Sequence, residues 1–309
     1  MVMRYFITLI MICAFVLAKG EDDASYVQIS IPVACMREEG SHSSQLVSQT
    51  ILGTPMKVLA KEGEWWALKG PDDYEGYVNI SGFVPMPTER LEAWKNSRRL
   101  MVNSIREAVV LVDSLTAGEG RNVLSSLVNG SIVEGVIRAG SEFVKITLPD
   151  GRMGYIETSG VAPLDSMPKL DMEELIDKCY SLMDTPYLWG GCSTKSMDCS
   201  GLVRLLFLNY GLLLPRDACD QFKTGTEVHE DLRPGDLMFF STTPEGAITH
   251  VALYDNDNRY IHCSGKVKVS GMSENDPDFS HRYYRGARRV FDSPECVGIK
   301  SIKSHSWYF

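Results

Sequence analysis

The spacing of apolar positions changes near residue 165 and divides the chain into a strand-rich part and a part that begins with helices. In the first part, short β-branched and aromatic runs alternate with Gly, Pro and Asp, which predicts strands joined by tight turns. Beyond it, 171–183 has apolar residues at helical spacing and acidic residues in its first turn, and 199–211 is a strongly apolar helical run. Strands are expected at 236–241, 250–255 and 259–264 and near 283–291. Helices followed by antiparallel strands predict an α+β domain over 167–309.

The strand-rich part contains an internal repeat. The segment EWWALKGPDDYEGYV at 64–78 aligns with EFVKITLPDGRMGYI at 142–156, at a constant offset of 78 residues. We therefore predict two small β-barrels, at 26–90 and 98–165, separated by a polar segment that is part helix and part linker. Each copy has a Trp or Phe strand followed by Gly-Tyr-Val or Gly-Tyr-Ile, and in this the copies resemble bacterial SH3 modules.

The N-terminal residues are expected to lie outside the fold. Arg4 precedes an apolar run, and Val16-Leu17-Ala18 has the small-residue spacing of a signal-peptidase site. This pattern favours a signal peptide at 1–18 and export to the periplasm or the cell exterior. A membrane anchor, the alternative, needs a longer apolar run. Cleavage would leave seven of the eight cysteines, so at least one thiol is expected to be unpaired.

Charge and cysteine spacing argue against several classes of function. The 309-residue chain has a net charge of −9, so it lacks the basic surface typical of proteins that bind nucleic acid or anionic membranes. It contains no C-x-x-C pair, which argues against a zinc cage or a redox dithiol. We predict neither a metal ion nor a cofactor.

One thiol and two imidazoles carry the candidate chemistry. Cys199 is expected at a helix start, where free N–H groups and the helix dipole favour a thiolate. His250 and His262 fall on two strands joined by the turn DNDN, and their separation of 12 places residue 256 at the centre of the hairpin. The two histidines would then be directly opposed, with Cβ atoms about 5 Å apart. One imidazole would accept the thiol proton while the other orients it, although singly each residue type is more often structural.

Five motifs identify the second part as similar to a known family. They are PYLWGG, MDCSGLV, LPRDACDQF, LRPGDLMFF and THVALYDNDNRYIHCSG, in this order over about 165–290. Together they resemble the NlpC/P60 family of papain-like cysteine peptidases. The resemblance implies that Cys199 is the nucleophile, His250 the base and His262 the third polar residue. With two SH3-like modules in front, the architecture resembles γ-D-glutamyl-L-diamino acid endopeptidases, which cut cell-wall peptides between γ-D-Glu and the diamino acid.

The same resemblance implies how a substrate is bound. In such enzymes the first module narrows the cleft, so that only a stem peptide with a free N-terminal L-Ala fits. The residue before the nucleophile, here Asp198, contributes a carboxylate to the free amine, and Ser200 and Tyr187 line the site. A buried ammonium needs such a carboxylate to compensate its desolvation. Asp198 also has the alternative role of a helix N-cap, and the two roles are compatible.

Arginines and additional cysteines leave alternatives open. Arg216 is the candidate partner for the α-carboxylate of D-Glu, with Arg204 and Arg233 as alternatives. Cys192 and Cys219 flank the expected site as a rival thiol or a disulfide partner, but neither has the helix-start context of Cys199.

The first module departs from the pattern of the relatives at one position. Where they tend to have Glu, this chain has Gln45, which leaves more of the amine recognition to Asp198 and to a tyrosine. Tyr74 and Tyr77 are both candidates for that tyrosine.

The sequence thus predicts an exported bacterial cysteine endopeptidase acting on released murein peptides such as L-Ala-γ-D-Glu-diamino acid. One alternative is a hydrolase of intact peptidoglycan that uses the SH3-like modules as wall anchors. Another is a wall-binding protein without catalysis. The sequence does not decide between diaminopimelate and lysine as the diamino acid.

Overall fold

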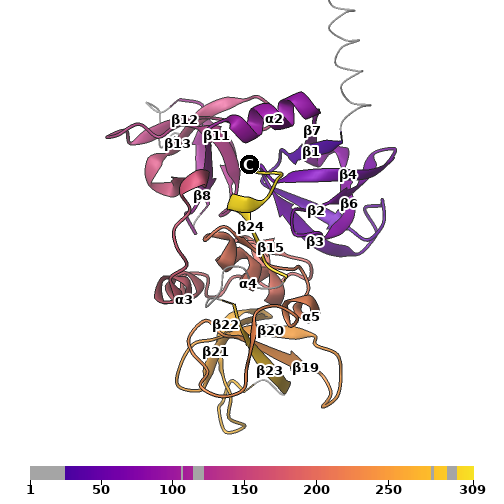
Figure 1. Ribbon diagram of the computed structural model, residues 1–309, viewed down its shortest axis with the longest axis vertical. Coiled ribbons are helices and arrows are strands. Elements are labelled where there is room, and N and C mark those ends of the chain that lie inside the picture. The colour runs from indigo at the N-terminus through magenta and orange to yellow at the C-terminus, as the bar shows by residue number, and fades with distance from the viewer. Residues whose placement is uncertain (1–24, 106, 114–121, 280–281, 291–297) are drawn as a thin grey trace, which may run out of the picture.

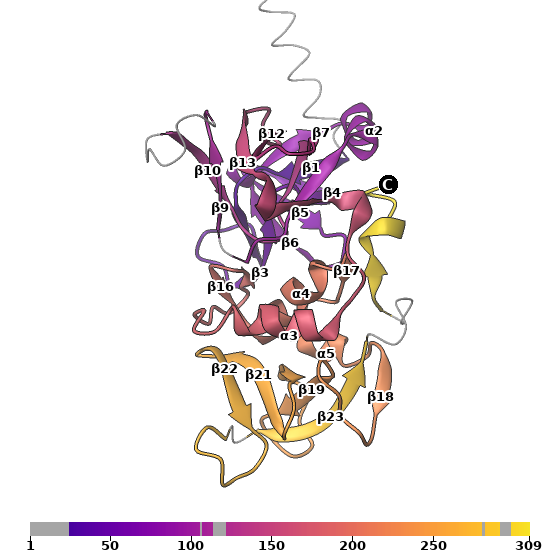
Figure 2. The ribbon, with the colours of Figure 1, turned by 90° about the vertical axis from the view of Figure 1, so that its left-hand side faces the viewer.

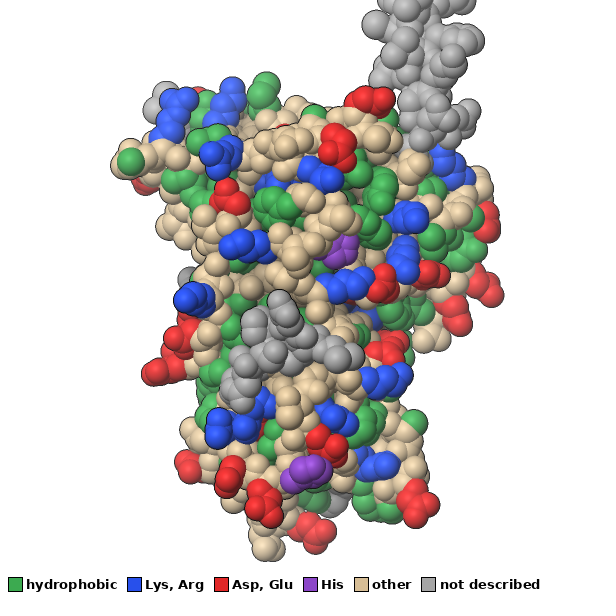
Figure 3. All heavy atoms as spheres, viewed as in Figure 1, with side chains coloured by type: hydrophobic (Ala, Val, Ile, Leu, Met, Phe, Trp, Pro, Cys, Tyr) green, Lys and Arg blue, Asp and Glu red, His purple; other side chains and the backbone are tan. Residues whose placement is uncertain are grey.

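The computed structural model describes residues 25–105, 107–113, 122–279, 282–290 and 298–309. The predicted signal peptide lies outside these residues. Within them, no helix is long and apolar enough to cross a membrane. Two β-rich units lie side by side, and an α+β domain lies against them (Figures 1 and 2). Cationic and anionic side chains are interspersed over the face seen in Figure 3.

The first β-rich unit is a seven-stranded antiparallel sheet with the strand order β3-β2-β6-β5-β4-β1-β7. Its core contains Val27, Leu68 and Val78, none of which is more than 1% exposed. The strands are β1 (Tyr26–Ile29), β2 (Val33–Arg37), β3 (Leu46–Ile51), β4 (Pro55–Glu62), β5 (Trp65–Lys69), β6 (Glu75–Asn79) and β7 (Phe83–Met86).

The second β-rich unit repeats this topology. Its strand order, β10-β9-β13-β12-β11-β8-β14, is that of the first unit with each label raised by seven. Strands β12 and β13 begin 78 residues after β5 and β6, which is the offset of the sequence repeat. Closure of each sheet into a barrel and the SH3 assignment remain predictions. The strands are β8 (Arg99–Val102), β9 (Ala108–Leu111), β10 (Val123–Leu127), β11 (Ile132–Gly135), β12 (Phe143–Thr147), β13 (Met153–Glu157) and β14 (Val161–Pro163).

Helix α2 (Thr88–Asn96) joins the two units, and helices α3 (Met172–Tyr180), α4 (Cys199–Leu208) and α5 (Ala218–Gln221) belong to the α+β domain. The six-stranded antiparallel sheet of this domain has the order β18-β23-β19-β20-β21-β22. Its strands are β18 (Thr226–Val228), β19 (Leu237–Ser241), β20 (His250–Tyr254), β21 (Arg259–Ser264), β22 (Lys266–Gly271) and β23 (Tyr283–Arg289). Two short pairs complete it, β15 (Cys192–Ser193) with β16 (Ser196–Met197) and β17 (Leu212–Leu213) with β24 (Lys300–Ser301).

Helix α4 is the centre of this domain and lies between the sheet and the β-rich units (Figures 1 and 2). Leu206 and Phe207 are fully buried, and Leu202 and Val203 are 1% exposed. The helix packs against β20 and β21 through one continuous hydrophobic core. Burial on nearly all sides explains why its sequence is apolar without a clear polar face.

The register of the β20–β21 hairpin differs from the prediction. Leu253 faces Ile261, so the hairpin is centred on Asp257 and not on residue 256. In this register His250 and His262 are diagonal neighbours and not directly opposed. The observed pairing is shifted by two residues from the predicted one. Because side chains alternate with a period of two, both histidines still lie on one face of the sheet.

The turn itself explains this register. The Arg259 N–H donates a 2.8 Å hydrogen bond to the carbonyl of Asn256. Asp257 and Asn258, between them, have φ angles of 47° and 58°. Short polar side chains tolerate this left-handed conformation, so the pair forms the tip of the turn and moves its centre by one residue.

The C-terminal segment contacts all three parts of the molecule. Strand β24 pairs with β17, and the segment runs up between the β-rich units (Figure 1). The carbonyl of the buried Tyr308 accepts a 2.5 Å hydrogen bond from Nη1 of Arg99 in the second unit. Nε2 of His305 lies 3.0 Å from the carbonyl of Pro71 in the first unit. The segment therefore ties the units to the α+β domain.

We expect Tyr308→Ala to lower the free energy of unfolding by about 3 kcal/mol, because it opens a cavity where the three parts meet. Denaturant unfolding followed by tryptophan fluorescence measures this. Tyr283→Ala is the matched control, since Tyr283 is 48% exposed, and it should cost less than about 0.5 kcal/mol. Equal losses for the two variants would contradict the tying role of the C-terminal segment.

Candidate active site

Cys199 is the first residue of α4, as the sequence predicted. Asp198 caps the helix, and its Oδ1 accepts a 2.8 Å hydrogen bond from the Gly201 N–H. Gly201 is required because a Cβ there would lie 2.0 Å from the carbonyl oxygen of Gly191. The Cys-Ser-Gly sequence thus lets the helix start press against the glycine-rich loop. The first N–H groups of α4 have no intrahelical acceptor and are directed toward this end.

The two histidines form a hydrogen-bonded pair. Nε2 of His250 and Nδ1 of His262 are 2.7 Å apart, and the ring centroids are 5.0 Å apart. Nε2 of His262 lies 3.0 Å from Oγ of Ser270 on β22. This series of hydrogen bonds orients the His250 ring and leaves Nδ1 of His250 available to exchange a proton with a thiol. The backbone of Val251, the residue after His250, hydrogen-bonds the sulfur of Cys199, so the nucleophile lies at the start of β20.

Burial determines the resting charges of these groups. It raises the pKa of Cys199 to about 11, with a further contribution from the negative charge of Asp198. Burial likewise lowers the pKa of His250 well below 6.5 and that of His262 to about 3. Backbone hydrogen bonds from Val251 and from Ser200 at the helix start lower the pKa of Cys199, as the prediction expects, but burial outweighs them. The resting state is a neutral thiol beside a neutral imidazole.

Asp198 and Arg216 form a buried ion pair behind the nucleophile. Asp198 accepts five hydrogen bonds, including one of 2.5 Å from Nη2 of Arg216 and one of 2.9 Å from the Gly190 N–H. The side chains of the pair are only 7% and 2% exposed. Nη1 of Arg216 also donates to Oγ of Ser200 at 2.8 Å. The N-cap role of Asp198 is observed directly. Ser200 is buried beside the ion pair, and its role in lining a substrate site stays a prediction.

The same pair argues against one predicted role. Arg216 was expected to bind the α-carboxylate of a D-Glu residue, but Asp198, Ser200 and Ser48 occupy its donor nitrogens. A carboxylate from outside would have to compete with a buried one. The physical reason is that a guanidinium at 3% exposure needs a counter-charge inside the protein.

Known proteins share this arrangement of motifs. Residues 184–289 match the profile of the NlpC/P60 family. A Bacillus subtilis protein named γ-D-glutamyl-L-lysine dipeptidyl-peptidase is 30% identical over 225 residues, which cover 70% of this chain and 71% of that protein. The chain belongs to the NlpC/P60 family. A Bacillus cereus protein of the same name is 26% identical over 266 residues, covering 81% of this chain and 76% of that protein.

Solved structures agree with the fold. A crystal structure of an NlpC/P60 family protein from Bacillus cereus superposes with a TM-score of 0.75 at 20% identity, covering 86% of this chain and 100% of that chain. An NlpC/P60 endopeptidase from Photobacterium damselae gives a TM-score of 0.61 at 17% identity, covering 85% of this chain and 70% of that chain. The arrangement of two β-rich units on an NlpC/P60 domain is thus shared with the Bacillus cereus structure over most of its length.

The first β-rich unit of this NlpC/P60 protein reaches the candidate site through β3. Oγ of Ser48 accepts a 3.0 Å hydrogen bond from Nε of Arg216. Oε1 of Gln49 accepts a 3.0 Å hydrogen bond from the N–H of Cys192. Gln45, the predicted contact, precedes β3 and is exposed. The sequence reasoning missed Ser48 and Gln49, although polar residues within an otherwise apolar strand were the available signal.

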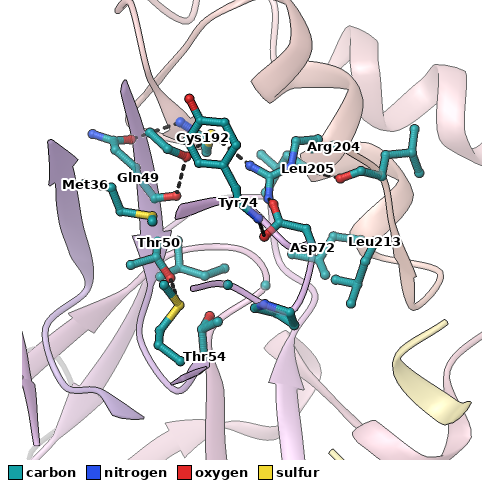
Figure 4. A pocket seen from close by; sticks show the side chains of 18 of the residues that line it. Met36, Gln49, Thr50, Thr54, Asp72, Tyr74, Cys192, Arg204, Leu205 and Leu213 are labelled. Carbon is teal, nitrogen blue, oxygen red and sulfur yellow. Dashed lines mark hydrogen bonds and ion pairs between the residues drawn. The ribbon is translucent and has the colours of Figure 1, made fainter. Parts of the chain in front are cut away.

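An ion pair reinforces this contact. Asp72 of the first unit binds Nη2 of Arg204 on α4, and Figure 4 shows both side chains beside Tyr74 and Cys192. Arg204 also donates from Nη1 to Sγ of Cys192 at 3.3 Å. Arg204 is therefore committed to the contact between the units and is not a free cation for a substrate carboxylate. Arg233, the other alternative, is exposed beside Asn256 on a different surface of the domain.

The structure separates the two tyrosine candidates. Tyr77 donates a 3.0 Å hydrogen bond to Glu62 on the surface of the first unit. Tyr74 faces the α+β domain, and burial together with the charge of Asp217 raises its pKa to about 12. Tyr187 of the YLWGG segment has a pKa raised to about 12 by burial and by the neighbouring Cys199. Tyr187 therefore adjoins Cys199, Tyr74 lies near Arg216 and Cys192 at the contact between the units, and Tyr77 lies on the surface of the first unit.

The rival cysteines lack the machinery of Cys199. Cys192 is buried at the contact between the units, and Cys219 is exposed on α5. The described cysteines are all unpaired, and among the described residues no three His, Cys, Asp or Glu side chains gather as a metal site. Among the cysteines that the structure describes, only Cys199 combines a helix start with a histidine pair.

The pH dependence of peptide cleavage follows from these pKa directions. His250 must be neutral to accept the thiol proton, and its pKa lies well below 6.5. As the pH falls through 6.5, kcat/KM should stay constant, and it should decrease only at a distinctly more acid pH. The measurement is kcat/KM as a function of pH. An acid limb centred at or above 6.5 would contradict the buried neutral imidazole.

Asp198→Asn isolates the charge of the buried pair, because asparagine keeps the N-cap. We expect a loss of about 3 kcal/mol in the free energy of unfolding, since Arg216 would remain buried without its counter-charge. Asp217→Asn is the matched control, because Asp217 is 47% exposed and 4.0 Å from Arg216, and its loss should stay below about 1 kcal/mol. Denaturant unfolding measures both variants. Similar losses in the free energy of unfolding would contradict the role of Asp198 as the counter-charge of Arg216.

Proposed function

We propose that this protein is an exported cysteine endopeptidase that hydrolyses the γ-D-glutamyl–diamino acid bond of murein peptides. The observation that carries the proposal is the link from Ser48 through Arg216 to Asp198 and Ser200, on either side of Cys199 in the chain. Through it, the first β-rich unit closes one side of the nucleophile. A cleft closed on this side suits a short, released peptide better than an intact wall.

The reaction needs only groups already described. Sγ of Cys199 attacks the γ-carbonyl of D-Glu while its proton passes to Nδ1 of His250. The N–H groups at the start of α4 stabilise the oxyanion. The C–N bond then breaks as His250 gives the proton to the leaving amine, and a thioester remains on Cys199. Water, deprotonated by His250, hydrolyses the thioester and restores the thiol. His262 and Ser270 hold the ring in position through both steps.

The requirement for a free N-terminal L-Ala is part of the proposal. A dipeptidyl-peptidase, as the Bacillus relatives are named, releases two residues from an amino terminus. On the closed side of the cleft, Tyr74 adjoins the half-exposed carboxylate of Asp217. The carboxylate of Asp198 lies deeper and is engaged by Arg216. Because Arg216 neutralises Asp198, the remaining negative charge belongs to Asp217, which a free ammonium can neutralise and an acetylated terminus cannot.

The test uses L-Ala-γ-D-Glu-diaminopimelate and L-Ala-γ-D-Glu-L-Lys, each bare and N-acetylated, with mass-spectrometric identification of the products. We expect cleavage after D-Glu in the bare peptides and a loss of about tenfold or more on acetylation. Cys199→Ala, the control, should lower the rate by about a thousandfold or more. Equal cutting of bare and acetylated peptides would favour a hydrolase of intact peptidoglycan. No cutting of any peptide would favour a wall-binding protein without catalysis.

A further inference from the structure

Two cations near the histidine pair have no salt-bridge partner within the described part of the chain. They are Arg282, the residue before β23, and Lys268 on β22, and both are half-buried. We refer to these two residues as the cationic rim. The mechanism described above uses neither of them. Unpaired, partly desolvated cations beside an active site favour an anionic ligand.

Strand pairing places the rim on the face that carries the histidines. Lys268 is directly opposite His262 in the β21–β22 pair. On the other side, Tyr284 is opposite Phe240, and Phe240 is opposite His250, so these three residues form one row across the sheet. Arg282 lies just outside β23, two residues before Tyr284, and the strand alternation continued by one residue puts it on this face.

Arg282 also lies at the same end of the sheet as His250. Strands β20 and β23 are both antiparallel to β19, so they run in the same direction. His250 is the first residue of β20, and Arg282 precedes the first residue of β23. The cation is therefore next to the end of the sheet where the proton is transferred.

The electrostatics agree with this placement. After burial, the charge of Arg282 is the largest cause that lowers the pKa of His250. After burial, Lys268 and then Arg282 lower the pKa of His262. The acidic group that acts on His262, Asp278, is itself paired with Arg259 at 2.7 Å. No acidic side chain described here neutralises the rim.

The side of the cleft identifies the part of the substrate. Under the proposed function, the acyl part of the substrate lies on the side of α4, Ser48 and the Asp198–Arg216 pair. The rim lies on the sheet beyond His250, which gives its proton to the leaving amine. The rim therefore faces the fragment that leaves.

We propose that Arg282 and Lys268 bind a carboxylate of the leaving diamino acid fragment, an inference that rests on the proposed function. The carboxylate has two possible sources with the same chemistry. One is the C-terminal carboxylate of a tripeptide, and the other is the additional carboxylate on the side chain of diaminopimelate.

Three substrates separate these sources: L-Ala-γ-D-Glu-L-Lys, the same peptide as its C-terminal amide, and L-Ala-γ-D-Glu-diaminopimelate with an amidated C-terminus. The rim variants are Arg282→Gln and Lys268→Gln, with Arg282→Lys as the conservative variant. Arg233→Gln is the matched control, because it removes an equal charge from an exposed site elsewhere. Initial rates over a range of substrate concentrations give kcat and KM separately.

For Arg282→Gln we expect kcat/KM to fall about tenfold or more on each substrate whose carboxylate binds the rim, mainly because KM rises. On the amidated lysine peptide the change should stay within about twofold, and Arg282→Lys should retain part of the activity. A loss restricted to the free-acid lysine peptide identifies the C-terminal carboxylate. A loss restricted to the diaminopimelate peptide identifies the side-chain carboxylate.

The results that overturn the proposal are also distinct. Equal losses on all three substrates would show that Arg282 only supports the structure. Unchanged kinetics of both rim variants, with active wild-type enzyme, would refute the rim alone. Failure of the wild-type protein to cut any of the three would refute the proposed function instead.

Discussion

The buried pair of Asp198 and Arg216 is the constraint on which the rest of the site depends. One carboxylate caps α4, holds the glycine-rich loop through Gly190 and neutralises Arg216, which in turn binds Ser48 of the first β-rich unit. Taking two charges out of water is costly, so the pair persists only while each hydrogen bond is in place. The position of Cys199 and the position of the first unit are therefore fixed by the same group.

Desolvation dominates the chemistry of the reacting groups in the same way. A thiol and an imidazole that are both buried stay neutral, and in the proposed reaction charge develops only when the thiol attacks. The N–H groups at the helix start, whose effect on the resting sulfur is outweighed by burial, would then stabilise the developing oxyanion. The hydrogen bonds from His250 to His262 and on to Ser270 stabilise the imidazolium without a permanent charge beside it.

Local features of the fold could be predicted from the sequence, and long-range ones could not. The start of α4 at Cys199 followed from an acidic cap before an apolar run, and the shared face of His250 and His262 followed from strand periodicity. The hairpin register was missed because Asp257 and Asn258 adopt left-handed backbone. Polar residues in β3 mark Ser48 as unusual, but its partner is 168 residues away, and the local pattern does not say which residue it contacts.

The two sides of Cys199 differ in charge, and this difference can orient a substrate. On the acyl side, Arg216 is neutralised within the protein, and Asp217 leaves the region around Tyr74 negative. On the leaving side, the rim is positive. Under the proposed function, the free terminal ammonium of L-Ala would lie toward Asp217, and a carboxylate of the leaving fragment would lie toward the rim. A reversed peptide would place like charges together at both ends, in a partly desolvated cleft where such repulsion is weakly screened. In this proposal, the charges on the two sides of Cys199 select the direction in which a peptide lies in the cleft.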